Sequence, residues 1–238
     1  MSRKIAIFKA GTALERVKNT HGDFEEFFIE GMDIPDSMSD VVDFTGEAKP
    51  ALPERPAGIV ITGSRRLVTE GSIVQDNVKA FVKAFCETGV PVLGVCFGHQ
   101  ILAELFGGHV GFLPGGKETG TVEVTLTERG GEDVLFSVLP PVFSVQTSHY
   151  ETVSEIPESA ACTVHGQRDR HHGLVFSSSA WGVQFHPEFT ADIMRTYIMG
   201  QKESLERDGL DTDALIRGLR DDEAGKKLLQ RFRDFALG

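Results

Sequence analysis

The chain has 238 residues, of which 40% are hydrophobic and 25% are charged, and its formal net charge is −11. This composition is typical of a globular protein, and no apolar run approaches the ~18 residues of a membrane-spanning helix. The negative charge repels phosphate backbones and acidic lipids, so we expect neither nucleic acid nor a membrane as a partner. The three cysteines are widely spaced and odd in number, which predicts free thiols in a reducing, cytoplasmic environment.

The first hundred residues alternate between two kinds of pattern. Short apolar runs of the strand type are followed by longer segments whose apolar residues recur at helical spacing. The predicted strands are 5–8, 40–44, 58–62 and 92–95, and the predicted helices are 11–20, 23–30, 72–88 and 100–106. Such alternation predicts an α/β fold with a doubly wound, mostly parallel sheet and right-handed crossovers. Functional sites in these sheets lie beyond the carboxyl ends of the strands.

The pattern changes after Gly108. Residues 121–127 alternate as an antiparallel strand does, and further short strands are predicted at 140–145, 160–164, 174–176 and 182–185. From residue 191 onward the chain is charged and helical in pattern, with predicted helices at 191–207, 211–219 and 221–237. We therefore expect one main domain in residues 1–190, with an antiparallel elaboration, and a helical extension in residues 191–238 packed against it.

Cys96 lies where an apolar strand pattern meets a helical one. The glycines two positions before and after it, Gly94 and Gly98, let two pieces of backbone approach closely, as in a nucleophile elbow. At such a turn the sulfur is exposed near a helix N-terminus, whose partial positive charge favours the thiolate. The alternative is a buried core cysteine, which is also our interpretation of Cys86 and Cys162.

A histidine and a glutamate, His186 and Glu188, follow a strand pattern and are separated by Pro187. A thiolate nucleophile needs a base within hydrogen-bond distance, and the base needs an acceptor that orients its second ring nitrogen. Proline turns the chain off the strand, so that both side chains can point around one corner. We therefore predict a catalytic triad of Cys96, His186 and Glu188, to which a plain strand end with a polar turn is the alternative.

The segment Gly94-Val95-Cys96-Phe97-Gly98-His99-Gln100, together with His186-Pro187-Glu188, resembles the class I glutamine amidotransferase family over about residues 1 to 190. The resemblance implies a flavodoxin-like amidotransferase fold and hydrolysis of a side-chain amide by the triad. It also implies an oxyanion hole formed by the backbone N–H groups of Phe97 and Ser64. The family usually has Gly-Gly-Pro or Gly-Pro-Gly at this second turn, so Ser64-Arg65 departs from its pattern.

The same resemblance assigns substrate binding to Gly63, Gln100 and the segment Ser148-His149-Tyr150. Tyr150 stands where many members have glycine, and Glu151 stands where they have aspartate, which predicts a reshaped pocket. Taken alone, His149 is a strand-end histidine.

Neither a cofactor nor a metal is expected. His165, His171 and His172 surround Arg168-Asp169-Arg170. A metal site needs closely spaced ligands with a carboxylate or thiolate nearby, and we interpret this cluster as a solvated hairpin tip instead.

Two enzymatic functions fit these residues, with glutamine or a γ-glutamyl small molecule as the substrate. The first, favoured by the helical extension, is a self-contained γ-glutamyl hydrolase in which Arg65 or Arg66 receives the carboxylate of a larger substrate. The alternative is a glutaminase subunit that delivers ammonia to a synthetase on a separate chain. A regulatory protein on the same fold would need no triad, and the presence of all three residues argues against it.

Overall fold

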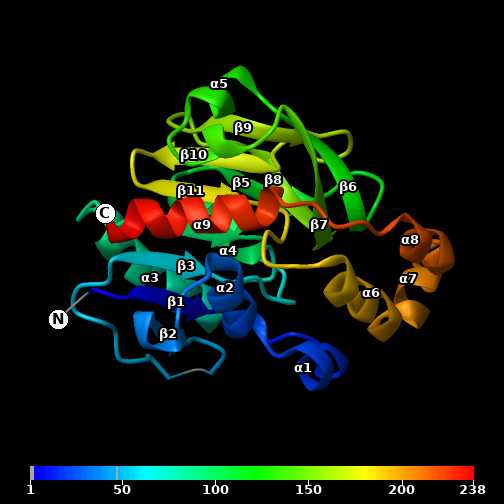
Figure 1. Ribbon diagram of the computed structural model, residues 1–238, viewed down its shortest axis with the longest axis horizontal. Coiled ribbons are helices and arrows are strands. Elements are labelled where there is room, and N and C mark those ends of the chain that lie inside the picture. The colour runs from blue at the N-terminus through cyan, green and yellow to red at the C-terminus, as the bar shows by residue number, and fades with distance from the viewer. Residues whose placement is uncertain (1–2, 47) are drawn as a thin grey trace.

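The computed structural model describes residues 3–46 and 48–238 (Figure 1). The strands are β1 (Ile5–Lys9), β2 (Ser39–Asp43), β3 (Gly58–Ile61), β4 (Val92–Val95), β5 (His109–Phe112), β6 (Glu118–Leu126), β7 (Val142–His149), β8 (Glu151–Glu155), β9 (Ala161–Gly166), β10 (Gly173–Ser177) and β11 (Ala180–Val183). The helices are α1 (Glu15–His21), α2 (Phe24–Met32), α3 (Ile73–Cys86), α4 (Phe97–Leu105), α5 (Glu128–Glu132), α6 (Ala191–Gly200), α7 (Lys202–Arg207), α8 (Thr212–Gly218) and α9 (Ala224–Leu237), with short 3-10 turns at Asp36–Met38 and Phe136–Val138.

A large central sheet has the strand order β2-β1-β3-β4-β11-β10-β9-β6-β7. The strands from β2 to β11 in this order run parallel, and those from β11 to β7 are paired antiparallel. A smaller sheet pairs β5 with β8. The predicted fold class, a doubly wound and mostly parallel sheet with an antiparallel elaboration and C-terminal helices, is confirmed.

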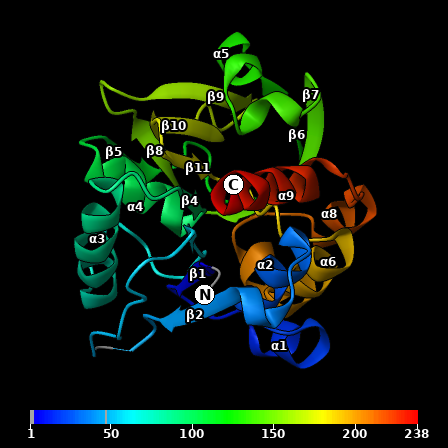
Figure 2. The same ribbon diagram turned by 60° about the vertical axis from the view of Figure 1, so that its left-hand side comes forward.

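Helices cover both faces of the parallel half of the sheet, which explains its continuous apolar strands. In β1, Ile5 and Ile7 face a core cluster shared with α2 and α9, whereas Ala6 and Phe8 face a second cluster shared with α3 and α4. Figure 2 shows α3 and α4 on one side of the strands and α2 and α9 on the other. The helix predicted at 72–88 begins after Ser72, whose hydroxyl accepts a hydrogen bond from the Gln75 amide and so caps the first turn.

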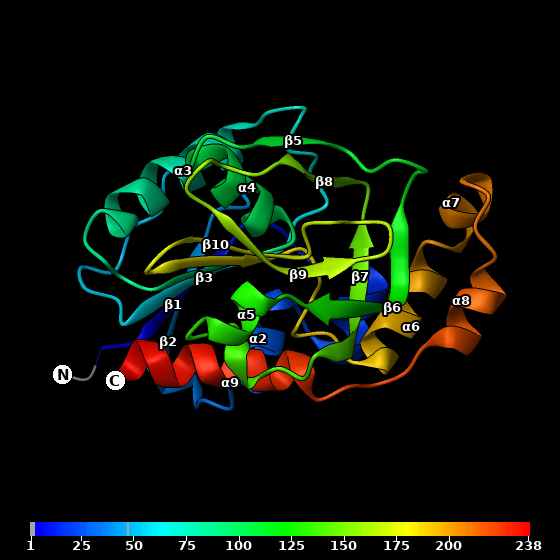
Figure 3. The same ribbon diagram turned by 90° about the horizontal axis from the view of Figure 1, so that it is seen from above.

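The C-terminal segment does two different things. Helices α6, α7 and α8 gather at one end of the molecule, and α9 then runs back along the sheet toward the other end (Figures 1 and 3). Leu228, Leu229 and Phe232 of α9 are fully buried in the main core. The predicted boundary at residue 190 falls between β11 and α6 and stays a prediction.

Several predicted elements differ from the structure in physically informative ways. The helix expected at 11–20 begins only at Glu15, because the Ala10 and Ala13 amides donate instead to side chains of Thr62 and Asp23. The single helix expected at 191–207 is interrupted at Gln201, after the unfavourable helix residue Gly200. Strands β5 and β8 were not predicted. No helix in the described ranges is long and apolar enough to cross a membrane.

Candidate active site

Cys96 occupies a strained turn between β4 and α4. Its backbone φ is 51°, a left-handed conformation that non-glycine residues rarely adopt. Any side chain on Gly94 would collide with the Gly98 carbonyl, and a Cβ on Gly98 would lie 2.6 Å from the Ile61 carbonyl oxygen. The two glycines thus permit the close strand–helix approach that the sequence predicts. The expectation of an exposed sulfur is wrong, because Cys96 is only 6% exposed and lies at the floor of a cavity.

His186 and Glu188 form a buried polar pair beside Cys96. The His186 backbone N–H donates to the Gln146 carbonyl, which holds the residue at the end of β11 next to β7. Its Nδ1 lies 2.7 Å from Glu188 Oε1, and both side chains are buried. The ring stacks on Phe189, with 4.2 Å between centroids, and this stacking restricts its rotation. The structure thus brings the side chains on either side of Pro187 into contact.

The charge state of His186 follows from its neighbours. Burial disfavours the imidazolium, but the Glu188 carboxylate and the Cys96 sulfur, through charge and hydrogen bonding, raise the pKa of His186 to about 10. The imidazolium is therefore the stable form at neutral pH, with a carboxylate on one side and the sulfur on the other. An imidazolium in this position holds a proton that it can pass to a leaving group.

The predicted oxyanion donors lie on two turns that meet at Cys96. A Cβ on Gly63 would come within 2.9 Å of His186 Cε1, so only glycine allows this turn to pack against the imidazole. The next residue, Ser64, lines the same cavity as the sulfur. Phe97 begins α4, and the first N–H groups of a helix have no acceptor inside the helix. Both turns therefore lie next to Cys96, where a developing oxyanion would form.

A cavity of about 150 Å³ brings most of the sequence-predicted site residues together. The predicted residues that line it are Ser64, Cys96, Gln100, Ser148, His149, Tyr150 and His186. The other predicted residues lie behind this surface: Gly63 packs against the imidazole, Glu188 holds its far nitrogen, and the Phe97 side chain is buried. The Gln100 side-chain amide donates to the Glu151 carbonyl and to Gln184, so its N–H groups are already engaged within the protein.

Glu151, the first residue of β8, contacts the loop that follows the Ser64 turn. Its carboxylate accepts hydrogen bonds from the backbone N–H groups of Val68, at 2.6 Å, and Thr69, at 3.2 Å, and from the Thr69 hydroxyl. Its own carbonyl accepts hydrogen bonds from the side chains of Gln100 and His149. One residue therefore fixes the loop after the oxyanion turn relative to the cavity wall. Glutamate in place of the usual aspartate has the longer reach for this contact.

We expect Glu151→Gln to lower kcat for the side-chain amide hydrolysis that the sequence resemblance implies, by roughly 10- to 100-fold, with a smaller change in KM. The neutral amide weakens the charge-assisted hydrogen bonds that hold the loop, so the predicted oxyanion donor at Ser64 can move out of position. Such a donor stabilises the transition state more than the bound substrate, so its displacement lowers kcat more than it changes KM. Steady-state kinetics of this variant would test it, with Glu155→Gln as a control because Glu155 is exposed on the same strand. Equal losses in both variants, or an effect confined to KM, would contradict this role.

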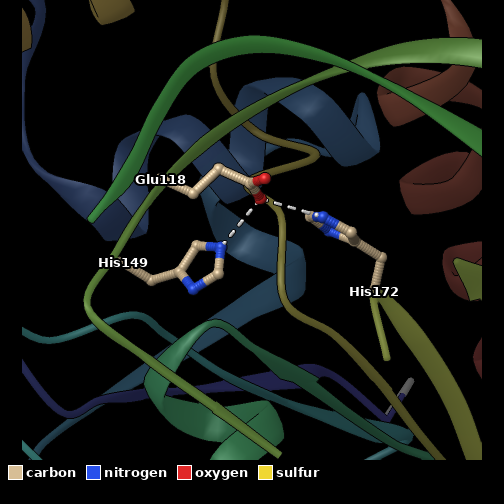
Figure 4. Close-up of side chains that lie close together, drawn as sticks. All are labelled: Glu118, His149 and His172. Atoms are coloured by element: carbon tan, nitrogen blue, oxygen red, sulfur yellow. Dashed lines mark hydrogen bonds and ion pairs between the residues drawn. The ribbon is translucent and has the colours of Figure 1, made fainter. Parts of the chain in front are cut away.

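A second buried polar cluster supports the wall of the cavity from behind (Figure 4). Glu118 Oε2 lies 3.2 Å from His149 Nε2 and 3.0 Å from His172 Nε2, and all three side chains are buried. Burial raises the pKa of Glu118, but hydrogen bonds from the two histidines outweigh it and hold that pKa far below its usual range. These atoms have the composition of a metal site, yet hydrogen bonds to the shared oxygen already account for their arrangement.

The same cluster corrects the prediction of a solvated hairpin tip at residues 165–172. His172 is fully buried and Asp169 is 1% exposed. The strand pattern could not reveal this, because the burial of His172 depends on its contact with Glu118, 54 positions earlier in the chain.

Sequence reasoning also missed residues that come from the helical extension. Tyr197 and Gln201, from α6 and the position after it, line the cavity beside Lys117. Tyr150 donates its hydroxyl hydrogen to Asp208, just beyond α7, at 2.7 Å. No local motif marks these residues, since they meet the site only through tertiary packing.

Comparisons with known proteins give the family and the fold of the chain. The family model "Glutamine amidotransferase class-I" matches residues 37–202. A glutamine-hydrolysing GMP synthase subunit of Methanopyrus kandleri is 29% identical over 75% of this chain and 94% of its own length, and that of Methanococcoides burtonii is 30% identical over 72% and 85%. The fold matches a glutamine amidotransferase of Thermotoga maritima with a TM-score of 0.79, at 21% identity over 100% of this chain and 99% of the other. The chain belongs to the class I glutamine amidotransferase family.

Proposed function

We propose that the protein hydrolyses the side-chain amide of glutamine through Cys96, His186 and Glu188 and that the ammonia is used by a synthetase on a separate chain. The observation that supports hydrolysis most directly is the strained Cys96 at φ 51°, beside an imidazole held by Glu188 at 2.7 Å. Strain of this kind persists where the surrounding structure enforces it, and it occurs often at catalytic residues.

In the proposed reaction, the Cys96 thiolate attacks the δ-carbonyl carbon of glutamine and a C–S bond forms. The negative charge moves to the carbonyl oxygen, where the N–H groups of Phe97 and Ser64 donate to it. The His186 imidazolium gives its proton to the nitrogen as the C–N bond breaks, and ammonia leaves. The neutral imidazole then takes a proton from water, which attacks the thioester and releases glutamate. Glu188 holds the ring and stabilises its charged form throughout.

Delivery of ammonia to a separate chain is favoured by the relatives rather than by the residues alone. The sequence patterns favour a self-contained γ-glutamyl hydrolase, but the curated relatives named above are glutamine-hydrolysing subunits of GMP synthases. The chain also matches 26% of the length of a GMP synthase of Aeropyrum pernix, so it corresponds to only one part of that larger protein. These relatives support the alternative in which glutamine is the substrate and ammonia the product that is passed on.

The test is a substrate panel followed by a partner assay. Purified protein is incubated with glutamine, γ-glutamylmethylamide and γ-glutamylalanine, while glutamate and ammonia are quantified. We expect glutamine to be the preferred substrate. We also expect its rate to rise when a synthetase subunit that lacks its own glutaminase is added with its nucleotide substrates, with Cys96→Ala protein as the blank. Faster cleavage of γ-glutamylalanine, without any effect of the synthetase, would favour the self-contained hydrolase instead.

A further inference from the structure

Lys117 is a buried cation inside the catalytic cavity. It follows Gly116 in the loop that leads into β6, is only 5% exposed and lines the same cavity as Cys96. The two arginines at the cavity, Arg65 and Arg66, are by contrast exposed at its rim. A ligand would therefore contact Lys117 only after the ligand has entered the cavity and lost its hydration.

The contacts of Lys117 orient its ammonium group without neutralising it. Nζ donates to Gln201 Oε1 at 2.8 Å and lies 4.7 Å from the centroid of the Tyr150 ring. Tyr150 is itself held by its hydrogen bond to Asp208. Within the described ranges no ion pair joins Nζ to a carboxylate, whereas the half-buried Lys9 contacts both Asp23 and Glu25.

A buried charge of this kind is costly unless a partner compensates it. Burial lowers the pKa of Lys117 to about 8, and the negative charges of Asp208 and Cys96 offset that effect only in part. An ammonium group has three donors, and one protein acceptor leaves it able to receive a carboxylate. A negatively charged group of a ligand in the cavity would therefore compensate the charge of Lys117.

We propose that Lys117 binds the α-carboxylate of the glutamyl substrate and that Gln201 and Tyr150 hold it in position for this contact. The inference rests on the proposed function, since it takes the δ-carbonyl of the substrate to be at Cys96. Glutamine carries its one carboxylate at the opposite end of a short methylene chain, so both ends are bound within one small cavity. A strong bond to that end commits the substrate to one orientation, with its amide at the sulfur. Gln201 lies at the junction of α6 and α7, so the C-terminal helices contribute directly to substrate selection.

The test pairs a protein substitution with a substrate truncation. The truncated substrate is 4-aminobutanamide, which is glutamine without its α-carboxylate. The variants are Lys117→Met, which keeps a similar stem and loses the charge, and Lys117→Arg, which keeps the charge. Lys202→Met is the matched control, because Lys202 is exposed on α7 and pairs with Glu206.

For the wild type and Lys202→Met we expect removal of the carboxylate to lower kcat/KM about 100-fold, as for loss of one partner of a buried charge pair. With glutamine, Lys117→Met should have a kcat/KM about 100-fold below that of the wild type. With 4-aminobutanamide, the kcat/KM of Lys117→Met should be close to that of the wild type. Lys117→Arg should recover part of the kcat/KM for glutamine. A truncation penalty in Lys117→Met equal to that of the wild type would overturn the assignment.

Binding separates this inference from the proposed reaction. L-Glutamine, whose only carboxylate is the α-carboxylate, is titrated by calorimetry into Cys96→Ala and into Cys96→Ala/Lys117→Met. Weaker binding to the double variant, by at least about tenfold, supports the carboxylate site even if the wild type shows no glutaminase activity. Equal affinity of the two proteins would reject the role of Lys117, even if the wild type hydrolyses glutamine rapidly.

Discussion

Cys96→Ala is expected to lower the rate of glutamine hydrolysis by at least ~10⁴-fold, as removal of a triad nucleophile does. The thioester intermediate needs the sulfur, and no neighbouring side chain at the cavity floor can replace it. The fold should persist, because the substitution removes a single sulfur atom at the wall of an existing cavity. Measurement of glutamate release together with the urea unfolding midpoint would separate the two effects.

The cysteines also differ in the reactivity expected of their thiols. Burial raises the pKa values of Cys86 and Cys162 to about 11, so both remain protonated at neutral pH. A glutamine-like alkylating agent should therefore label Cys96 first, and peptide mapping would locate the label. Chief labelling of either other cysteine, or full activity of Cys96→Ala, would remove Cys96 from the mechanism.

The local part of the site could be predicted from the sequence because its chemistry is encoded in short segments. Gly94 and Gly98 are required where α4 packs closely against β4 and β3, and the contact between His186 and Glu188 spans a single proline. The strands of the first hundred residues likewise form a sheet in which helices connect strands that are close in the chain. In each case the residues that interact are close in the chain, or belong to elements with a strong periodic pattern.

The remainder of the pocket depends on contacts between distant segments. Lys117 meets Gln201 across 84 positions, and Glu151 meets Val68 across 83. A lysine after a glycine-rich loop is an ordinary surface residue by pattern, and its burial depends on distant segments that include Gln201 and Tyr150. The departure at Tyr150 acquires its meaning in the same way, since the ring that replaces glycine covers the Lys117 ammonium and bonds to Asp208.

His186 and Glu188 are expected to contribute unequally to the rate of hydrolysis. His186 transfers protons to the leaving nitrogen and from the attacking water, whereas Glu188 acts on those steps only through the imidazole. Glu188→Gln keeps an oxygen or nitrogen near Nδ1, and Phe189 still stacks on the ring, so part of its orientation survives. The variant loses the negative charge that favours the imidazolium, and the pKa of His186 should fall.

We therefore expect His186→Ala to lower kcat by ~10⁴-fold or more, and Glu188→Gln to retain at least about tenfold more activity than His186→Ala. Glutamate release measured for both variants between pH 6 and 9 would test this order. Glu158→Gln serves as the control, since Glu158 is exposed in the turn between β8 and β9. If His186→Ala kept wild-type activity, the imidazole would have no part in proton transfer, and the raised pKa beside Cys96 would need another explanation. If Glu188→Gln were as inactive as His186→Ala, the carboxylate would be required for the charged imidazole itself and not only for its orientation.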